Sequence, residues 1–259
     1  MKVSIIGSTG FIGKFLSESL SKNFDILNFS IRNENISELR EELINQIFSS
    51  EIIINCAVSL NPKTQSDYFL NEKFTSYLIS LNKKFKRKII HLSSLNTLIE
   101  DRLDNYSISK KKCEKMIKNK ENLFLIRLPL VYQKENNIIQ SEGNVSKIFN
   151  YLRKIKLPVY PMIYPGHLYQ PIEIDYLKNT ILEIIRGKEI RNEINLIGNK
   201  KIYLWDLFKE IAEIEKKKTL KLDLRFLYNV LPNSLKTIIK KQNNFIQQIA
   251  SIDHSKFFM

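Results

Sequence analysis

Glycine and proline are scarce in this sequence, with seven of each among 259 residues. Together with a hydrophobic fraction of 43%, this composition argues against a mostly disordered chain. The length is enough for one large α/β unit, or for a nucleotide-binding domain with a small second lobe. The composition therefore predicts a globular protein.

Cysteine is rarer still, and the two cysteines, Cys56 and Cys113, fit neither a disulfide framework nor a metal-binding spacing. No apolar run reaches the roughly 18 residues that a membrane-spanning helix needs. The first predicted strand starts at Lys2, which argues against a signal peptide. We therefore expect no metal, no membrane span and a cytoplasmic location.

Acidic residues are outnumbered by basic ones, 27 against 41, which gives a formal net charge of +14. The excess is spread along the chain, whereas nucleic-acid-binding proteins usually cluster their basic residues. We therefore expect a solvated basic surface and no nucleic-acid partner. Contact of residues 220–241 with a membrane surface is an alternative, but Pro232 breaks the helical pattern there.

Strands and helices alternate from the first residue. Short β-branched apolar runs predict strands, and apolar residues at helical spacing predict the helices between them. In chain order these segments are 3–6, 11–20, 24–29, 36–48, 51–58, 67–81, 88–92, 106–118 and 123–128, beginning and ending with a strand. Continuous apolar strands separated by helices indicate a parallel sheet that is covered on both faces. The predicted fold class is therefore α/β, a Rossmann-type doubly wound parallel sheet.

The composition of the sequence changes after Pro129, where prolines and tyrosines become frequent and predict many loops. We predict a Rossmann domain over residues 1–130 and a smaller C-terminal substrate-binding lobe over residues 131–259, with residues 171–199 returning to the sheet domain. The later helices and strands are expected at 145–153 (helix), 171–174 (strand), 176–186 (helix), 193–197 (strand), 204–214 (helix) and 235–249 (helix).

Residues 7–13 read Gly-Ser-Thr-Gly-Phe-Ile-Gly and join the first strand to the first helix. Gly7 permits the tight turn, Gly10 lets a pyrophosphate approach the backbone, and Gly13 allows close packing of the helix on the strand. The helix N-terminus presents free N–H groups to the phosphates. This context predicts a dinucleotide site, to which we assign Gly7, Thr9, Gly10, Phe11, Ile12 and Gly13.

The end of the second predicted strand carries no carboxylate, since residues 29–33 read Phe-Ser-Ile-Arg-Asn. An acidic residue there would bind the ribose 2′-hydroxyl and favour NAD. Ser30 and Arg32 can instead bind a 2′-phosphate. We therefore expect NADP as the preferred cofactor, with NAD as the alternative.

Tyr106 and Lys110 are four residues apart, so they lie one turn apart on one face of a predicted helix. A phenol is a poor acid–base group at neutral pH, but a neighbouring ammonium stabilises the phenolate and lowers the pKa of the phenol. Such a pair can donate or accept a proton. Ser94 ends the fourth strand, at the sheet edge where ligands bind, and its hydroxyl can hydrogen-bond a reacting carbonyl. These three residues predict a catalytic site.

The glycine loop, Ser94 and the Tyr106–Lys110 pair together resemble the extended branch of the short-chain dehydrogenase/reductase superfamily, often called the NAD-dependent epimerase/dehydratase family. The resemblance covers most of the chain. It implies a nicotinamide cofactor and assigns catalysis to Ser94, Tyr106 and Lys110. It also implies further cofactor contacts from Cys56, Ala57, Asn71, Pro129 and the catalytic Tyr106 and Lys110 themselves.

The resemblance further implies a nucleotide-diphosphate sugar as the substrate and a role in surface-polysaccharide assembly. In the sugar 4,6-dehydratases of this family an Asp-Glu pair follows the catalytic serine, whereas Leu95 and Asn96 follow Ser94 here. These residues supply neither the base nor the acid that elimination of water needs, so we do not expect dehydration. The short chain and the NADP-like strand end favour a 4-keto-sugar reductase.

Two other functions stay open. A nucleotide-sugar epimerase would retain its NAD through the catalytic cycle. A non-catalytic NAD(P)-binding protein would use the same fold as a sensor or an assembly subunit, although such proteins usually lose the tyrosine or the lysine. A homodimer is a possible assembly in each case.

Overall fold

The computed structural model describes residues 1–31, 41–59, 69–100, 104–135, 138–141, 154, 159–164, 168–189, 191–214 and 216–223. The chain divides into two compact units. Unit 1 contains Met1–Leu128 and Ile174–Leu196, and unit 2 contains Pro129–Glu173 and Ile197–Met259. The chain therefore leaves unit 1 after Leu128 and returns to it once. Substrate binding by the second unit stays a prediction.

Unit 1 is built on a six-stranded sheet in which every neighbouring pair of strands is parallel. Its strand order is β11-β5-β4-β3-β1-β2, with β1 (Lys2–Ile6), β2 (Asp25–Phe29), β3 (Ile52–Asn55), β4 (Lys88–Ser94), β5 (Leu123–Leu128) and β11 (Glu193–Asn195). The chain runs from β1 to β2 on one side and then continues with β3 on the other side of β1. This reversal is the switch point of a doubly wound sheet, so the predicted fold class is confirmed.

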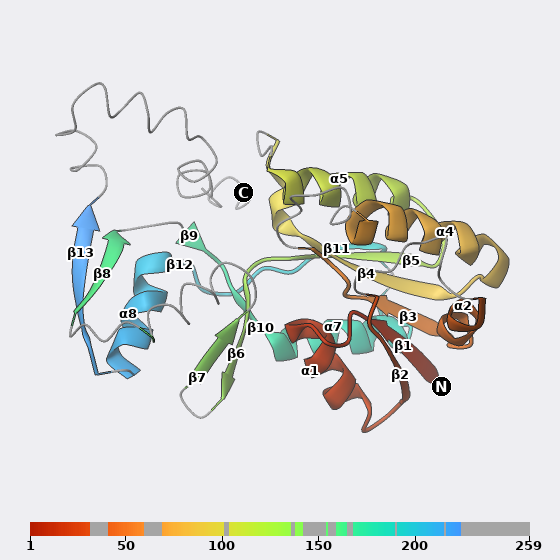
Figure 1. Cartoon of the computed structure of the whole chain (residues 1–259), viewed down its shortest axis with the longest axis horizontal. Helices are drawn as coiled ribbons and strands as arrows, with labels where there is room; N and C mark the ends of the chain where they lie inside the picture. Colours follow the sequence, from red (N-terminus) through yellow and green to blue (C-terminus); the bar gives the residue numbers. More distant parts are fainter. Residues whose placement is uncertain are drawn as a thin grey trace. The chain divides into compact units, whose positions relative to one another are not determined.

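Helices cover both faces of this sheet. Figure 1 shows α4 (Phe74–Phe85) and α5 (Asn105–Ile117) on one face, and α1 (Phe11–Leu20) and α7 (Ile174–Ile185) on the other. The π-helical turn η2 (Phe69–Lys73) leads into α4, and the 3-10 helix η3 (Leu95–Leu98) follows β4. Because both faces are covered, all residues of β3 and β5 are buried, which explains why their sequences are mostly apolar.

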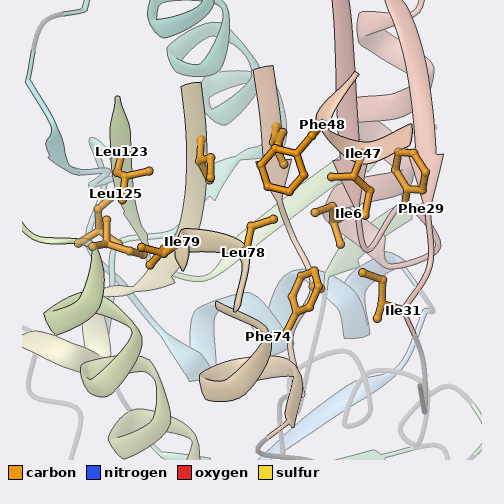
Figure 2. Close-up of a cluster of buried hydrophobic side chains, with 14 residues drawn as sticks. Ile6, Phe29, Ile31, Ile47, Phe48, Phe74, Leu78, Ile79, Leu123 and Leu125 are labelled. Carbon is orange, nitrogen blue, oxygen red and sulfur yellow. The ribbon is translucent and has the colours of Figure 1, made fainter. Parts of the chain in front are cut away.

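The main core lies between the sheet and the helices α2 (Glu41–Phe48), α4 and α5. Figure 2 shows Phe48, Phe74 and Leu78 directed toward Ile6, with the leucines of β5 at the far end of the same cluster. Phe48 also stacks on Phe85, with ring centroids 4.5 Å apart. Full burial of such a side chain contributes roughly 1.5–3 kcal/mol. This layer packs α4 and α5 against the sheet, and α5 carries Tyr106 and Lys110.

Unit 2 contains more strands than the sequence predicted. Its described residues form three small sheets, β10-β6-β7, β12-β9 and β13-β8, together with α8 (Leu204–Ile214). Their strands are β6 (Val131–Glu135), β7 (Ile138–Ser141), β8 (Val159–Tyr164), β9 (Leu168–Tyr169), β10 (Ile172–Glu173), β12 (Ile202–Tyr203) and β13 (Lys218–Asp223). The expectation of loop-rich material was therefore wrong for these segments. Pro161 argued against a strand, but it lies in a two-stranded sheet, where a strand has an edge that needs no backbone donor.

Two helices predicted in this half, 145–153 and 235–249, lie outside the described residues. The first residues of the segment considered for membrane contact belong to β13, which pairs in parallel with β8, and are therefore not helical. Within the ranges that the structure describes, no helix has the length and apolar character to cross a membrane.

Candidate functional site

The glycine loop has the geometry of a close backbone crossing. Gly7 has a φ of +83°, and a Cβ atom there would lie 2.7 Å from the backbone nitrogen of Ala57. A Cβ atom on Gly13 would collide with the carbonyl oxygen of Gly7. Gly10, in contrast, has φ −78° and ψ 168°, which any residue adopts. The fold therefore requires glycine at positions 7 and 13, whereas the backbone dihedrals at position 10 suit any residue.

The N-terminus of α1 offers donors to an anion. Gly10 is its N-cap residue, no side chain caps it, and the first turn carries no acidic residue. The backbone N–H groups of the first turn, at Phe11 and Ile12, are the donors that a helix leaves without intrahelical partners. The Oγ1 atom of Thr9 lies 3.4 Å from Oγ of Ser30, so the residue after β2 lies beside the loop. Arg32, the second predicted 2′-phosphate ligand, lies outside the described residues.

The end of β3 forms the other wall of the loop. Cys56 N donates to the carbonyl oxygen of Ile6 at 2.9 Å, and Ala57 N donates to Oδ1 of Asn55 at 3.2 Å. These bonds hold Cys56 and Ala57 against the turn at Gly7. The structure thus brings the predicted contacts of β1, β2 and β3 together at one edge of the sheet.

A buried histidine that the sequence analysis missed supports this wall. Asn55 Nδ2 lies 3.1 Å from Nδ1 of His91, and because Oδ1 of Asn55 accepts from Ala57, its amide nitrogen must face the histidine. Nδ1 of His91 is therefore the acceptor and Nε2 carries the proton, an assignment made from the hydrogen-bond network. Burial, and next the charge of Lys110, hold the pKa of His91 well below its usual range. His91 is therefore a neutral side chain, and Nε2 has no partner among the described residues.

Helix α5 carries the predicted tyrosine and lysine. Asp104 caps it, accepting at Oδ1 from the backbone N–H of Ser107 at 3.0 Å, so Tyr106 lies in the first turn. Lys110 is only 3% exposed, and its Nζ donates to the carbonyl oxygen of Leu92 at 2.8 Å. The Tyr106–Lys110 face of α5 is therefore directed at β4, two residues before Ser94.

The structure distinguishes between the two serines at the end of β4. Ser93 donates its hydroxyl hydrogen to Oε1 of Glu114 at 2.6 Å, so that hydroxyl is already engaged. Oγ of Ser94 accepts from the backbone N–H of Asn96 at 3.2 Å and thereby caps η3. Within the described part of the chain, the Ser94 hydroxyl donates to no acceptor. Ser94 is therefore the serine that can donate to a ligand.

Asn71 lies in η2 and is buried. Its Oδ1 accepts from Ser59 N at 2.9 Å, and its Nδ2 lies 3.1 Å from Ser59 O and 2.8 Å from Oγ of Ser109. Ser109 in turn donates to the carbonyl oxygen of Tyr106 at 2.9 Å. The side chain of Asn71 thus links the tail of β3 to the first turn of α5, and its assignment as a cofactor contact stays a prediction.

A buried ion pair lies beneath the site. Arg127 donates from Nε and Nη2 to Oε2 of Glu114 at 2.9 and 2.7 Å, and from Nη2 to Glu193 at 2.9 Å. Burial lowers the pKa of Arg127, but the hydrogen bonds to the two carboxylates outweigh it, so the net shift is upward. The sequence analysis missed this network, although a charged residue in the wholly buried strand β5 is a signal for one. Pro129 follows β5 at the start of unit 2.

In the described ranges, no three His, Cys, Asp or Glu side chains come close enough to hold a metal ion. The candidate site of unit 1 consists of a glycine turn, an uncapped helix end and a serine, tyrosine and lysine on β4 and α5.

The strand order and the glycine turn after β1 define a Rossmann-type doubly wound fold, which solved structures share, and the tyrosine–lysine pair lies on the helix after β4. Solved structures of nucleotide-sugar enzymes share this fold. They include dTDP-4-dehydrorhamnose reductase from Bacillus anthracis in complex with NADP, at a TM-score of 0.67 and 19% identity, over 86% of this chain and 84% of that chain.

UDP-glucuronic acid 4-epimerase from Bacillus cereus in complex with NAD has a TM-score of 0.69 and 18% identity, over 86% of each chain. For dTDP-glucose 4,6-dehydratase from Bacillus anthracis in complex with NAD the values are 0.65 and 17%, over 86% of this chain and 84% of that chain. By sequence, no protein-family model and no curated protein matches the chain. The likeness therefore extends to the fold, as the sequence resemblance predicted.

Proposed function

We propose that this chain is an NAD(P)-dependent oxidoreductase of the extended short-chain dehydrogenase/reductase family, which reduces the 4-keto group of a nucleotide-diphosphate sugar. One observation carries the proposal. Lys110 is fixed by Leu92 on β4, while Ser94, two residues further along that strand, has a hydroxyl hydrogen that no described acceptor takes. The Ser94 hydroxyl and the Tyr106–Lys110 pair can therefore bind a substrate carbonyl group at the carboxyl edge of the sheet.

The glycine turn supports a dinucleotide cofactor. The turn leaves no room for a Cβ atom at Gly7 or Gly13, and the α1 N-terminus supplies uncapped N–H donors for phosphates. Bound nicotinamide would supply the hydride for the reduction. Ser30 lies beside the loop, and β2 ends without a carboxylate, which favours NADP over NAD.

The chain's own residues would then handle the proton and the carbonyl oxygen. Tyr106 gives its phenolic proton to that oxygen as negative charge develops on it. The ammonium of Lys110, one turn along α5, stabilises the phenolate that is left. Ser94 donates a hydrogen bond to the same oxygen and holds it in line. The phenolate recovers a proton from solvent, and the product is the corresponding sugar alcohol.

Reduction fits the residues after Ser94 better than dehydration does. Leu95 is 3% exposed, and neither it nor Asn96 in η3 is a carboxylic acid. The acid and base that elimination needs are therefore lacking directly after Ser94. Among the solved structures of the same fold, the reductase supports a dTDP-linked 4-keto sugar as the substrate class. Surface-polysaccharide assembly and a cytoplasmic location remain part of this proposal.

The decisive experiment follows the absorbance of NADPH with purified protein and dTDP-4-dehydrorhamnose or a UDP-linked 4-keto sugar. We expect one NADPH to be consumed for each alcohol formed. Inversion of UDP-glucuronic acid at its fourth carbon, with no net change in cofactor, would instead identify an epimerase. Tight cofactor binding without turnover of any of these sugars would favour a non-catalytic NAD(P)-binding protein.

A further inference from the structure

Glu114 connects the two elements that carry the proposed catalytic residues. It lies on α5 at the fourth position after Lys110, and is thus on the same helix face as Tyr106 and Lys110. The side chain is 5% exposed. A carboxylate buried this deeply is stable only when its oxygens are hydrogen-bonded and its charge is paired.

The two carboxylate oxygens of Glu114 face different elements. Oε2 accepts from Nε and Nη2 of Arg127 on β5, at 2.9 and 2.7 Å, and this ion pair supplies the charge balance. Oε1 accepts from Ser93 Oγ at 2.6 Å and from Thr97 Oγ1 at 2.7 Å. One oxygen therefore anchors the side chain to the sheet, and the other binds the segment that contains Ser94.

The two hydroxyls that Glu114 binds flank Ser94 in the sequence. Ser93 precedes it at the end of β4, and Thr97 follows it in η3. Thr97 Oγ1 also lies 2.7 Å from the carbonyl oxygen of Ser94, so its single hydroxyl hydrogen is shared between Ser94 and Glu114. The backbone around Ser94 is therefore held on both sides by one side chain of the helix that carries Tyr106.

We propose that Glu114 is a positioning residue, which holds the Ser94 hydroxyl in register with the Tyr106–Lys110 face of α5. The inference rests on the proposed function for its kinetic consequences. Glu114 itself touches neither substrate nor cofactor in this role. It acts through Ser93 and Thr97, because the position of Ser94 relative to Tyr106 decides whether both can reach one carbonyl oxygen.

Replacing Glu114 itself would remove one of the two carboxylates that pair with Arg127. The loss of stability and the loss of positioning could then not be separated. The sharper test removes the hydroxyls and keeps the ion pair. Thr97→Val has nearly the same shape as the native side chain but no hydroxyl, whereas Thr97→Ser loses a methyl group and keeps the hydroxyl. Ser93→Ala removes the second contact to Glu114.

We expect the Ser93→Ala/Thr97→Val double variant to lose about ten- to a hundredfold in kcat, the range typical of small misplacements of reacting groups. Thr97→Ser should retain most of the turnover. The NADPH dissociation constant, measured by fluorescence titration, should stay unchanged in all variants because the glycine loop is untouched. Ser4→Ala is the matched control, because Ser4 is a fully buried serine whose hydroxyl donates to Ile47 O and Ser50 Oγ, away from β4.

Hydrogen exchange of the Asn96 amide gives a readout that needs no turnover, since this N–H is bound by Ser94 Oγ. We expect faster exchange in the double variant and native exchange in Ser4→Ala. Native kcat in the double variant would overturn the proposal, as would equal losses in Thr97→Ser and Thr97→Val. Wild-type protein without turnover would refute the proposed function alone, and the exchange of Asn96 would still decide the positioning role: native exchange in the double variant would overturn it.

Discussion

Lys110 Nζ donates a hydrogen bond to the carbonyl oxygen of Leu92, which joins α5 to β4 with a donor–acceptor distance of 2.8 Å. The lysine is 3% exposed, so its ammonium is held by strand backbone rather than by solvent. This bond fixes the lysine charge beside Leu92 of β4, two residues before the strand ends at Ser94. The packing of α5 on the sheet therefore holds in place the charge that the proposed mechanism needs beside the Tyr106 phenolate.

Tyr106→Phe should separate catalysis from folding. The variant keeps the ring and removes only the phenolic hydroxyl, so the thermal midpoint and the affinity for NADPH should stay close to those of the wild type. Turnover should fall by about 10²–10⁴, the usual contribution of a general acid. Ser94→Ala should lower turnover by a smaller factor, because it removes a hydrogen bond to the oxygen and not the proton. Steady-state kinetics beside a cofactor titration measure both, and near-native turnover of Tyr106→Phe would exclude the Ser-Tyr-Lys assignment.

Gly10→Ala should separate cofactor binding from folding in a different way. Gly10 has an ordinary φ of −78°, so an alanine fits the backbone, while its Cβ would stand where a pyrophosphate approaches the helix end. We expect a thermal midpoint close to that of the wild type and a loss of NADPH binding by calorimetry. Gly187→Ala is the control: Gly187 has a φ of +70° with open space around it, so this change should cost stability and leave cofactor affinity alone. Native NADPH affinity in Gly10→Ala would contradict a phosphate site at this turn.

The sheet of unit 1 was predictable because its strands β1, β3, β4 and β5 are almost wholly buried and mostly apolar. The three consecutive isoleucines of β3 indicate a buried strand, and the spacing of Ile174, Leu177 and Ile181 on α7 indicates a helix. The strands of unit 2 were not predictable in the same way. β8 contains Pro161, and β6 and β7 form a short hairpin whose residues 131–135 mix apolar with polar and charged side chains.

Only those parts of the candidate site that follow a local sequence pattern could be predicted. Tyr106, Lys110 and the glycine loop follow local spacing, which the sequence displays directly. The roles of Ser93, Glu114, Arg127 and His91 depend on contacts between residues 13 to 66 positions apart, such as Arg127 with Glu114 and Arg127 with Glu193. No local period encodes such contacts, although a charged or polar residue inside a buried strand indicates that a partner must exist.

Arg32→Ala should test the choice of cofactor. If Arg32 joins Ser30 in binding the 2′-phosphate, its loss should weaken NADPH binding by about ten- to a hundredfold, the equivalent of roughly 1.5–3 kcal/mol for a charged hydrogen bond. Binding of NADH, which lacks that phosphate, should stay unchanged. Lys22→Ala, which removes an exposed cation after α1, is the control and should affect neither cofactor. Equal binding of NADPH and NADH by the wild type would show that the residues after β2 do not bind the 2′-phosphate.

His91 should make the stability of the protein depend on pH. Burial and the charge of Lys110 hold the pKa of His91 well below its usual range in the folded protein, whereas the unfolded chain restores a value near about 6.5. Below that pH the unfolded state therefore binds a proton that the folded state does not, and stability falls as the pH falls. One such proton changes the free energy of unfolding by at most about 1.4 kcal/mol per pH unit.

His91→Gln isolates this effect, because glutamine offers an acceptor oxygen to Asn55 Nδ2 and does not titrate. The free energy of unfolding, measured by denaturant titration at several pH values from about 7.5 to 5, should fall more steeply with acidification in the wild type than in the variant. Other titrating groups are the same in both proteins, so the difference between the two slopes belongs to His91. Parallel curves would show that His91 gains its proton as readily in the folded protein as in the unfolded chain, and the buried neutral pair with Asn55 would then be wrong.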